Sequence, residues 1–317
     1  MSTTQSVAHR LPGSDSAAPG SASNAPFQFV DCSAAYRGKD LPNAMSVDVE
    51  DYFQVSAFDD IISRDDWAGI EPRIADNMDR ILDVFAEHEV RSTFFILGWV
   101  CRRLPQVIKK IAEAGHEVAS HGDDHRRVWT KTPDEAFEDF SSTKKLLEDT
   151  SGVAVTGYRA PSFSIGARNL WAHDLLQEAG YQYSSSIFPV SHDHYGFPEA
   201  PRFPFKFRDD GLLEVPPTTV QRFGRNWPCA GGGYFRLFPY AYTAGGIRHV
   251  NQAEQMPAVF YFHPWEIDPD QPRVEGIPLK TRFRHYVNLK RFESRLTRLA
   301  SEFRWSRMDE IYLRDDG

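Results

Sequence analysis

From Ala44 onward the chain alternates between short apolar runs and longer segments whose apolar residues recur at helical spacing. The first such segment carries one apolar stripe, formed by Ile74, Met78, Ile81, Leu82 and Phe85. Short runs rich in β-branched and aromatic residues predict strands, which we expect at residues 45–50, 90–97, 117–120, 153–159, 181–187 and 258–262. Helices are expected along the stripe and at residues 105–114, 132–149 and 170–179.

Local signals define one of these helices at both ends. Thr132-Pro-Asp-Glu135 has the form of a capping box with proline at the first helical position, and Gly152 breaks the helix that follows. The regular alternation of strands and helices predicts an α/β fold with mostly parallel strands. The repeated succession of strand and helix is typical of a β/α barrel.

Two regions depart from the alternation. Residues 198–240 are rich in proline, glycine and aromatic residues, and we expect long loops around a cleft there. Residues 282–303 form an amphipathic, basic stretch, which predicts a helix that covers the barrel. We therefore divide the chain into a flexible leader at 1–42, a barrel domain at 43–270 and a helical C-terminal extension, packed on the barrel, at 271–317.

Composition narrows the function. The net charge of -8 argues against nucleic acid as a partner, because nucleic-acid binding needs a basic face. The three cysteines are widely spaced and indicate neither a disulfide framework nor a cysteine-rich zinc site. The N-terminus has no apolar signal core and no run is long enough to span a membrane, so we expect a cytoplasmic protein, with peripheral membrane contact left open.

Ionisable residues at the ends of apolar strands indicate a catalytic site, because a buried charge is costly unless it is paired, ligated or used. Asp48 and Glu50 share one face of the first strand, and Asp51 lies at its exit. One acid can bind a metal ion while the other accepts a proton from water.

Histidine and arginine follow three later strands. His121 and His125 lie four positions apart, with Gly122 allowing a tight bend between them, so both imidazoles can face one ion. Arg159 can keep Asp48 ionised and orient it. His263 can act as a general acid. Together these residues predict a hydrolase that uses a divalent metal ion.

Four motifs carry a family resemblance, in the order Ser46-Val-Asp-Val-Glu-Asp-Tyr52, Gly115-His-Glu-Val-Ala-Ser-His121 leading to His125, Tyr158-Arg-Ala-Pro-Ser162 and Phe260-Tyr-Phe-His-Pro-Trp265. The set resembles the polysaccharide deacetylases of carbohydrate esterase family 4, the NodB-like family. Within that family it is most similar to the branch found with exopolysaccharide and exosortase gene clusters. The resemblance spans residues 44–268.

The resemblance implies a distorted (β/α) barrel, a divalent ion that is usually Zn²⁺, and hydrolysis of N-acetyl groups on hexosamine units. It assigns Asp48 as base, His121 and His125 as metal ligands, Arg159 as the residue that steadies the base, and His263 as acid. The backbone N–H of Ser162 is the candidate oxyanion donor.

The chain departs from the family pattern at two places. The family has two adjacent aspartates, base and then ligand, whereas Val49 follows Asp48 here. The third metal ligand is therefore Glu50 or Asp51, and the sequence leaves both open. The stretch Tyr183-Ser-Ser-Ser186 lacks the acidic residue and tryptophan of the usual cleft wall, so the partner of the acid is not identified.

We predict from these residues an N-deacetylase acting on an exopolysaccharide or on its lipid-linked precursor. One alternative is an amide hydrolase acting on a small cyclic ureide or formamide. The other is a carbohydrate-binding relative without catalysis. The oligomeric state is not predicted.

Overall fold

The computed structural model describes residues 28–192 and 196–314 of the chain. Strands occupy β1 (Val30–Asp31), β2 (Asn43–Val49), β3 (Thr93–Ile96), β4 (Glu117–Ser120), β5 (Gly157–Tyr158), β6 (Tyr183–Ser184), β7 (Phe205–Lys206), β8 (Leu213–Glu214), β9 (Thr219–Arg222), β10 (Arg225–Pro228), β11 (Val259–Phe262) and β12 (Trp305–Ser306).

The α-helices are α1 (Ile74–Glu87), α2 (Gly98–Arg103), α3 (Pro105–Glu113), α4 (Pro133–Ser151), α5 (Trp171–Glu178), α6 (Gly232–Leu237), α7 (Tyr240–Gln252), α8 (Leu279–Tyr286), α9 (Phe292–Glu302) and α10 (Met308–Tyr312). Short 3₁₀ turns are η1 (Ser33–Ala35), η2 (Ser56–Phe58), η3 (Arg64–Gly69), η4 (Val128–Thr130), η5 (Pro161–Phe163), η6 (Pro264–Ile267) and η7 (Leu289–Arg291).

The main sheet has the order β1-β7-β8-β6-β5-β4-β3-β2-β11, with β12 also paired to β2. In this sheet the pairs from β8 through β11 are parallel, whereas the pairs β1–β7 and β7–β8 are antiparallel. The segment after β8 returns to β11, where Thr218 N–H donates to the Val259 carbonyl at 3.1 Å. The sheet thereby curls into a distorted barrel, and the predicted α/β class is confirmed.

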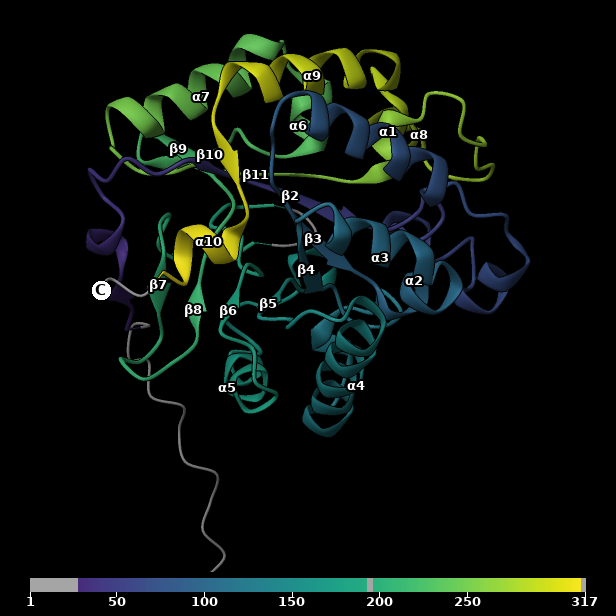
Figure 1. Ribbon diagram of the computed structural model, residues 1–317, viewed down its shortest axis with the longest axis horizontal. Coiled ribbons are helices and arrows are strands. Elements are labelled where there is room, and N and C mark those ends of the chain that lie inside the picture. The colour runs from purple at the N-terminus through teal and green to yellow at the C-terminus, as the bar shows by residue number, and fades with distance from the viewer. Residues whose placement is uncertain (1–27, 193–195, 315–317) are drawn as a thin grey trace, which may run out of the picture.

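Helices cover the strands from both sides. Figure 1 shows α1, α6, α7 and α9 on one side of the strands and α4 and α5 on the other. All seven residues of β2 are buried, as expected for a parallel strand covered on both faces. The helix α1 buries the whole predicted apolar stripe. The predicted capping box of α4 is present, and Gly152 ends the helix in the left-handed conformation at φ 74°.

The first strand lies before residue 43, inside the segment expected to be a flexible leader. Val30 and Asp31 pair with Lys206 and Phe205, and the neighbouring Phe29 ring packs edge-on against Phe205 at 5.2 Å. A two-residue strand carries no periodicity, so the sequence pattern could not reveal it. Residues 1–27 of the predicted leader lie outside the described residues.

The C-terminal segment differs from the prediction in two ways. It does not only pack on the barrel, because β12 pairs with β2 and joins the sheet. The single helix expected at 282–303 is wrong, since α8 and α9 are separated at Asn288, whose φ is 54°. A left-handed residue cannot continue a right-handed helix.

The region at 198–240 is more regular than expected. It contains β7, β8, the antiparallel hairpin β9–β10 and α6 in place of long loops alone. Among the described residues, no helix combines the length and the apolar character that a membrane span requires.

Candidate active site

Parallel strands bring the candidate residues to one edge of the barrel, where their carboxyl ends meet. Asp48 lies in β2 and Glu50 directly follows that strand, while His121 follows β4. Arg159 and His263 come directly after β5 and β11. The register pairs Phe262 with Val47, so His263 emerges beside Asp48.

Three of these residues form a group that could hold a metal ion. The ligand atoms of Glu50, His121 and His125 lie within 4.8 Å of one another, and all three side chains are buried. His121 Nδ1 lies 2.8 Å from the Arg159 carbonyl oxygen, which fixes Nδ1 as the protonated nitrogen. His121 Nε2 then carries a lone pair directed into the group.

The chemistry of this donor set fits a divalent cation. His121 Nε2 is buried without a hydrogen-bond partner, and such an orphaned atom is costly unless a ligand satisfies it. Glu50 Oε2 lies only 2.6 Å from His125 Nε2, yet it has no hydrogen bond of acceptable geometry. Two imidazole nitrogens and one carboxylate oxygen are the ligands that Zn²⁺ commonly takes in catalytic sites.

The ionisation of the group also suits a cation. Burial lowers the pKa of His121 to about 4, which keeps its imidazole neutral. Burial alone would raise the pKa of Glu50, but its interactions with His125 and His263 outweigh burial and lower the pKa to about 2. The site therefore presents a carboxylate and a neutral imidazole.

Backbone conformation presents His125 to the group. Gly122 has φ 73° and His125 has φ 58°, both in the left-handed region. The loop between them is tied down by Asp139, whose Oδ1 accepts the Asp123 N–H at 2.8 Å. His125 Nδ1 lies 3.4 Å from the Ser56 hydroxyl.

Asp51, the second candidate for the third ligand, lies outside this group. Its two carboxylate oxygens accept the backbone N–H groups of Tyr52 at 2.8 Å and Arg73 at 2.6 Å. Burial raises the pKa of Asp51 to about 6, against the opposing effect of these donors. Since Arg73 immediately precedes α1, Asp51 anchors the start of that helix, and the structure places Glu50 with the histidines.

Asp48 is held by a buried arginine. Arg159 Nη1 lies 2.6 Å from Asp48 Oδ1 and 2.9 Å from the Ser46 hydroxyl. Arg159 is itself fully buried, and its Nε and Nη2 donate to the backbone carbonyl and hydroxyl of Ser185. Asp48 Oδ1 is thus fixed, and Oδ2 faces His263 Nε2 at 3.9 Å.

His263 is supported by a carboxylate that the sequence did not identify. Glu266 Oε2 lies 3.0 Å from His263 Nδ1 and accepts the His263 backbone N–H at 3.0 Å. Glu266 is fully buried, and its other oxygen accepts from Arg236 Nε at 2.7 Å. Glu266 is therefore the partner of His263 that the departure at residues 183–186 left unidentified.

The electrostatic setting favours a protonated His263. Burial alone would lower its pKa, but Glu50, Glu266 and Asp48 together raise the pKa to about 9. The ring stacks on Trp265 with centroids 5.3 Å apart, and Trp265 Nε1 donates to Glu50 Oε1 at 3.3 Å. Trp265 thus connects His263 to the candidate metal group.

Ser162 lies beside the group on its far side. Its hydroxyl is 2.8 Å from the Ser56 hydroxyl, which in turn contacts His125. The Ser162 backbone has φ 54°, an uncommon conformation for serine. The structure thus places Ser162 next to the candidate metal centre.

Sequence reasoning missed five residues that complete the site: Ser46, Ser185, Arg236, Trp265 and Glu266. Glu266 lies three residues after His263, and a histidine followed at that spacing by glutamate in a 3₁₀ turn is a signal that could have found it. Arg236 and Ser185 gave no such signal, because only the fold brings them near.

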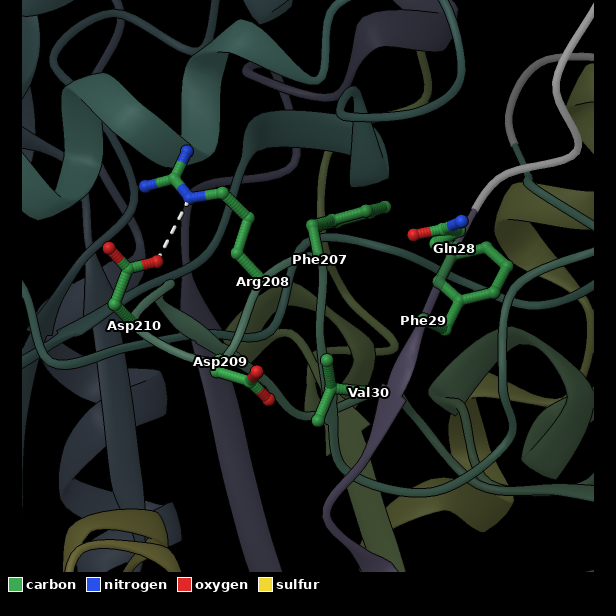
Figure 2. A pocket seen from close by; sticks show the side chains of 7 residues that line it. All are labelled: Gln28, Phe29, Val30, Phe207, Arg208, Asp209 and Asp210. Atoms are coloured by element: carbon green, nitrogen blue, oxygen red, sulfur yellow. Dashed lines mark hydrogen bonds and ion pairs between the residues drawn. The ribbon is translucent and has the colours of Figure 1, made fainter.

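A surface pocket lies at the far edge of the sheet, around β1 and β7 (Figure 2). Its lining comprises Gln28–Val30 and Phe207–Asp210, with Arg208 turned toward Asp210 at 3.1 Å. None of the site residues lines it. The candidate active site therefore lies at the barrel rim and not in this pocket.

Two protein-family models match two successive segments of the chain. Residues 54–184 match the polysaccharide deacetylase family, and residues 185–313 match a family described as a domain of unknown function (DUF3473). The first match contains His121, His125 and Arg159, whereas His263 and Glu266 lie in the second.

Curated relatives match part of the chain. The peptidoglycan-N-acetylglucosamine deacetylase PgdA of Listeria monocytogenes is 33% identical over 81 residues, which is 26% of this chain and 17% of the relative. The peptidoglycan deacetylase of Helicobacter pylori is 30% identical over 108 residues, or 34% of this chain and 36% of the relative. The aligned segments thus span well under two thirds of either relative.

Among solved structures, the chain is similar to a presumed polysaccharide deacetylase from Mycobacterium smegmatis. The TM-score is 0.53 at 19% identity, covering 86% of this chain and 90% of the other. At this identity the likeness establishes the fold. Over residues 54–184, this chain is therefore similar in sequence to the polysaccharide deacetylase family, and its fold is that of a solved structure described as a polysaccharide deacetylase.

Proposed function

We propose that the protein is a metal-dependent hydrolase that removes N-acetyl groups from hexosamine units of a saccharide. One observation carries the proposal: a metal-ligand set, Glu50, His121 and His125, lies beside a separate base and acid, Asp48 and His263. The His263 Nε2 atom is 3.7 Å from Glu50 Oε1, so the acid borders the metal group. A salt-bridge network with a purely structural role would not need a set of metal ligands kept separate from a base and an acid.

The residues would act in sequence on an acetamide and a water molecule. A divalent cation held by Glu50, His121 and His125 would polarise the acetyl carbonyl and acidify water. Asp48 Oδ2 accepts the proton of the attacking water, since Arg159 occupies Oδ1. His263 then donates a proton to the departing nitrogen, and acetate and a free amine are the products.

Glu266 and Ser162 assist this sequence. Glu266 accepts from His263 Nδ1, so the proton to be delivered lies on Nε2, toward Asp48 and Glu50. The Ser162 backbone N–H is the proposed donor to the oxygen that gains negative charge.

The finer assignments are also proposals. Zn²⁺ suits two imidazoles and one carboxylate. The names of the relatives as peptidoglycan deacetylases support an N-acetylated saccharide as the substrate. The motif resemblance favours an exopolysaccharide or its lipid-linked precursor, met by a cytoplasmic enzyme at the membrane surface.

Product analysis tests the proposal. Purified protein loaded with Zn²⁺ is incubated with a defined N-acetylglucosamine oligomer, and acetate is measured. Acetate release that falls roughly 10²–10⁴-fold in Asp48→Asn and in His263→Ala supports the assigned roles. Ammonia or formate release from a cyclic ureide or a formamide, without acetate, would instead support the alternative amide hydrolase. Saccharide binding without any product would indicate a non-catalytic relative.

A further inference from the structure

The short turn η4 forms part of the rim beside the candidate metal centre. It begins three residues after His125, and Val128 N–H donates to the Ser164 hydroxyl at 3.0 Å. Ser164 belongs to the loop that carries Ser162. The loops from β4 and β5 are therefore joined at this place, next to where an acetyl group would react.

Two arginines gather on one indole ring at this rim. The guanidinium carbon of Arg168 lies 3.7 Å from the ring centroid of Trp129, and that of Arg127 lies 5.9 Å from the same centroid. Arg168 is exposed and Trp129 is half-buried. Both distances are within the range of cation–π contact, so Trp129 holds two positive charges close together.

Neither guanidinium forms a direct ion pair within the part of the chain that the structure describes, although the charge of Arg127 acts on the half-buried Asp59 carboxylate. No carboxylate there lies within 4.0 Å of Arg127 or Arg168. By contrast, the adjacent Arg126 pairs with Asp124 at 2.7 Å. The Arg127 Nε atom is also buried without a hydrogen-bond partner. Two like charges and an orphaned donor at one rim favour the binding of an anion between them.

We propose that Arg127 and Arg168, held by Trp129, form a subsite for a carboxylate-bearing sugar unit next to the hexosamine that is deacetylated. The proposal rests on the proposed function and narrows its substrate to an acidic saccharide. The planar guanidinium fork matches a carboxylate in two-point hydrogen bonding. A local basic rim is also what an acidic chain would need to approach a protein of net charge -8.

Two probes test the subsite. A hyaluronan hexasaccharide carries a glucuronate beside each N-acetylglucosamine, whereas a chitin hexasaccharide has no charge. For each protein, kcat/KM for acetate release is measured on both, and the acidic-to-neutral ratio is compared between parent and variant. Arg168→Gln and Arg127→Gln should each lower that ratio about tenfold, mainly through KM on the acidic probe.

Arg298→Gln is the matched control. Arg298 also stacks on a ring, at 4.1 Å from the Tyr240 centroid, but it lies in α9 and not at this rim. An equal fall of the ratio in Arg298→Gln, or an unchanged ratio in both rim variants, would overturn the subsite.

A binding measurement separates this proposal from the proposed function. Calorimetric titration of hyaluronan hexasaccharide should show weaker binding to Arg168→Gln than to the parent, and the difference should shrink as NaCl increases. If the parent releases acetate from neither probe, the deacetylase function fails while this titration still decides the subsite. Equal binding to parent and variant would reject it.

Discussion

At the scale of single residues, the site depends on which carboxylates face which partners. Asp48 pairs with Arg159, whereas Glu50, two positions later, lies with His121 and His125. Asp51 instead accepts a backbone N–H at the start of α1. The spacing at the end of β2 brings Asp48 and Glu50 to the same site, because residues two apart share a face. The group that could hold a metal therefore keeps a carboxylate, from Glu50, although the chain lacks two adjacent aspartates at residues 48 and 49.

Metal content separates Glu50 from Asp51. Glu50→Gln should weaken metal binding by more than the roughly 10–100-fold that loss of an outer partner costs, because it removes a ligand. Asp51→Asn keeps the ligand set and should retain metal. The metal-to-protein ratio after dialysis against a weak chelator, measured by mass spectrometry of the elements, checks this. Loss of metal from Asp51→Asn alone would contradict the assignment.

The pH profile tests Glu266 as the partner of His263. The raised pKa of His263, about 9, keeps the acid protonated up to that pH, and activity falls as pH rises through it. Glu266→Gln removes one of the carboxylates that raise this pKa. The alkaline limb of kcat/KM should then move to lower pH, by about one unit.

A pH–rate series on parent and Glu266→Gln, with thermal unfolding measured in parallel, provides the comparison. Glu310→Gln, a partly exposed carboxylate that pairs with Arg91, is the control for charge removal. An alkaline limb that does not move in an otherwise folded Glu266→Gln protein would mean that Glu266 does not act on His263.

The residue types and their spacing along the sequence predicted most of the residues of the candidate site. Asp48, His121, His125, Arg159, Ser162 and His263 lie in one neighbourhood because each lies near the carboxyl end of a strand of the same barrel. Glu266 was not predicted although its spacing three residues after His263 offered a signal, and Arg236 was not predicted because it lies in a helix distant in the sequence. Their pairing at 2.7 Å is a product of the fold.

At the scale of elements, α6 brings Arg236 and a close glycine to the acid. A Cβ atom added at Gly232 would clash with the Glu266 carboxylate, whereas one added at Gly233 would meet no atom within 4 Å. Gly232 is thus required by the close approach of the helix start to Glu266.

Gly232→Ala should therefore impair catalysis far more than Gly233→Ala. Displacement of Glu266 should lower kcat at pH 8–9 by roughly 10-fold or more, since it removes support from the acid, whereas Gly233→Ala should change kcat little. Initial rates of acetate release for both variants and the parent check this. Equal effects of the two alanines would exclude the proposed contact.

Helices with long sequence patterns were predicted correctly, whereas the bounds of short strands were not. The stripe of α1 and the capping box of α4 were read correctly. β5 and β6 are only two residues each, so their predicted runs were too long. The break between α8 and α9 depends on the left-handed Asn288, which helical periodicity does not report.

At the scale of the whole molecule, the C-terminal segment packs against β2 and β3, the strands next to the candidate site. β12 pairs with β2, and Met308 N–H donates to the Thr93 hydroxyl at 2.7 Å. Met308 is fully buried against Ala44, Phe95 and Ala119 of the barrel strands. The sequence placed this segment on the barrel but could not show its strand.

Met308→Ala should lower the free energy of unfolding by about 2–5 kcal/mol, the usual range for a buried large-to-small change. Leu313→Ala, which removes a partly buried side chain at the edge of the same cluster, should cost less. Urea unfolding of parent and both variants gives the comparison. A larger loss for Leu313→Ala would contradict this account of the packing.

The central claim is that this barrel edge is a metal-dependent deacetylase site with Asp48 as its base. The most direct test is acetate release from an N-acetylglucosamine oligomer by the same protein before chelation, after chelation and after addition of Zn²⁺, with Asp48→Asn measured alongside. We predict that chelation abolishes release, that Zn²⁺ restores it, and that Asp48→Asn binds metal yet stays roughly 10²–10⁴-fold slower. Release that persists without metal, or full activity in metal-loaded Asp48→Asn, would contradict the claim.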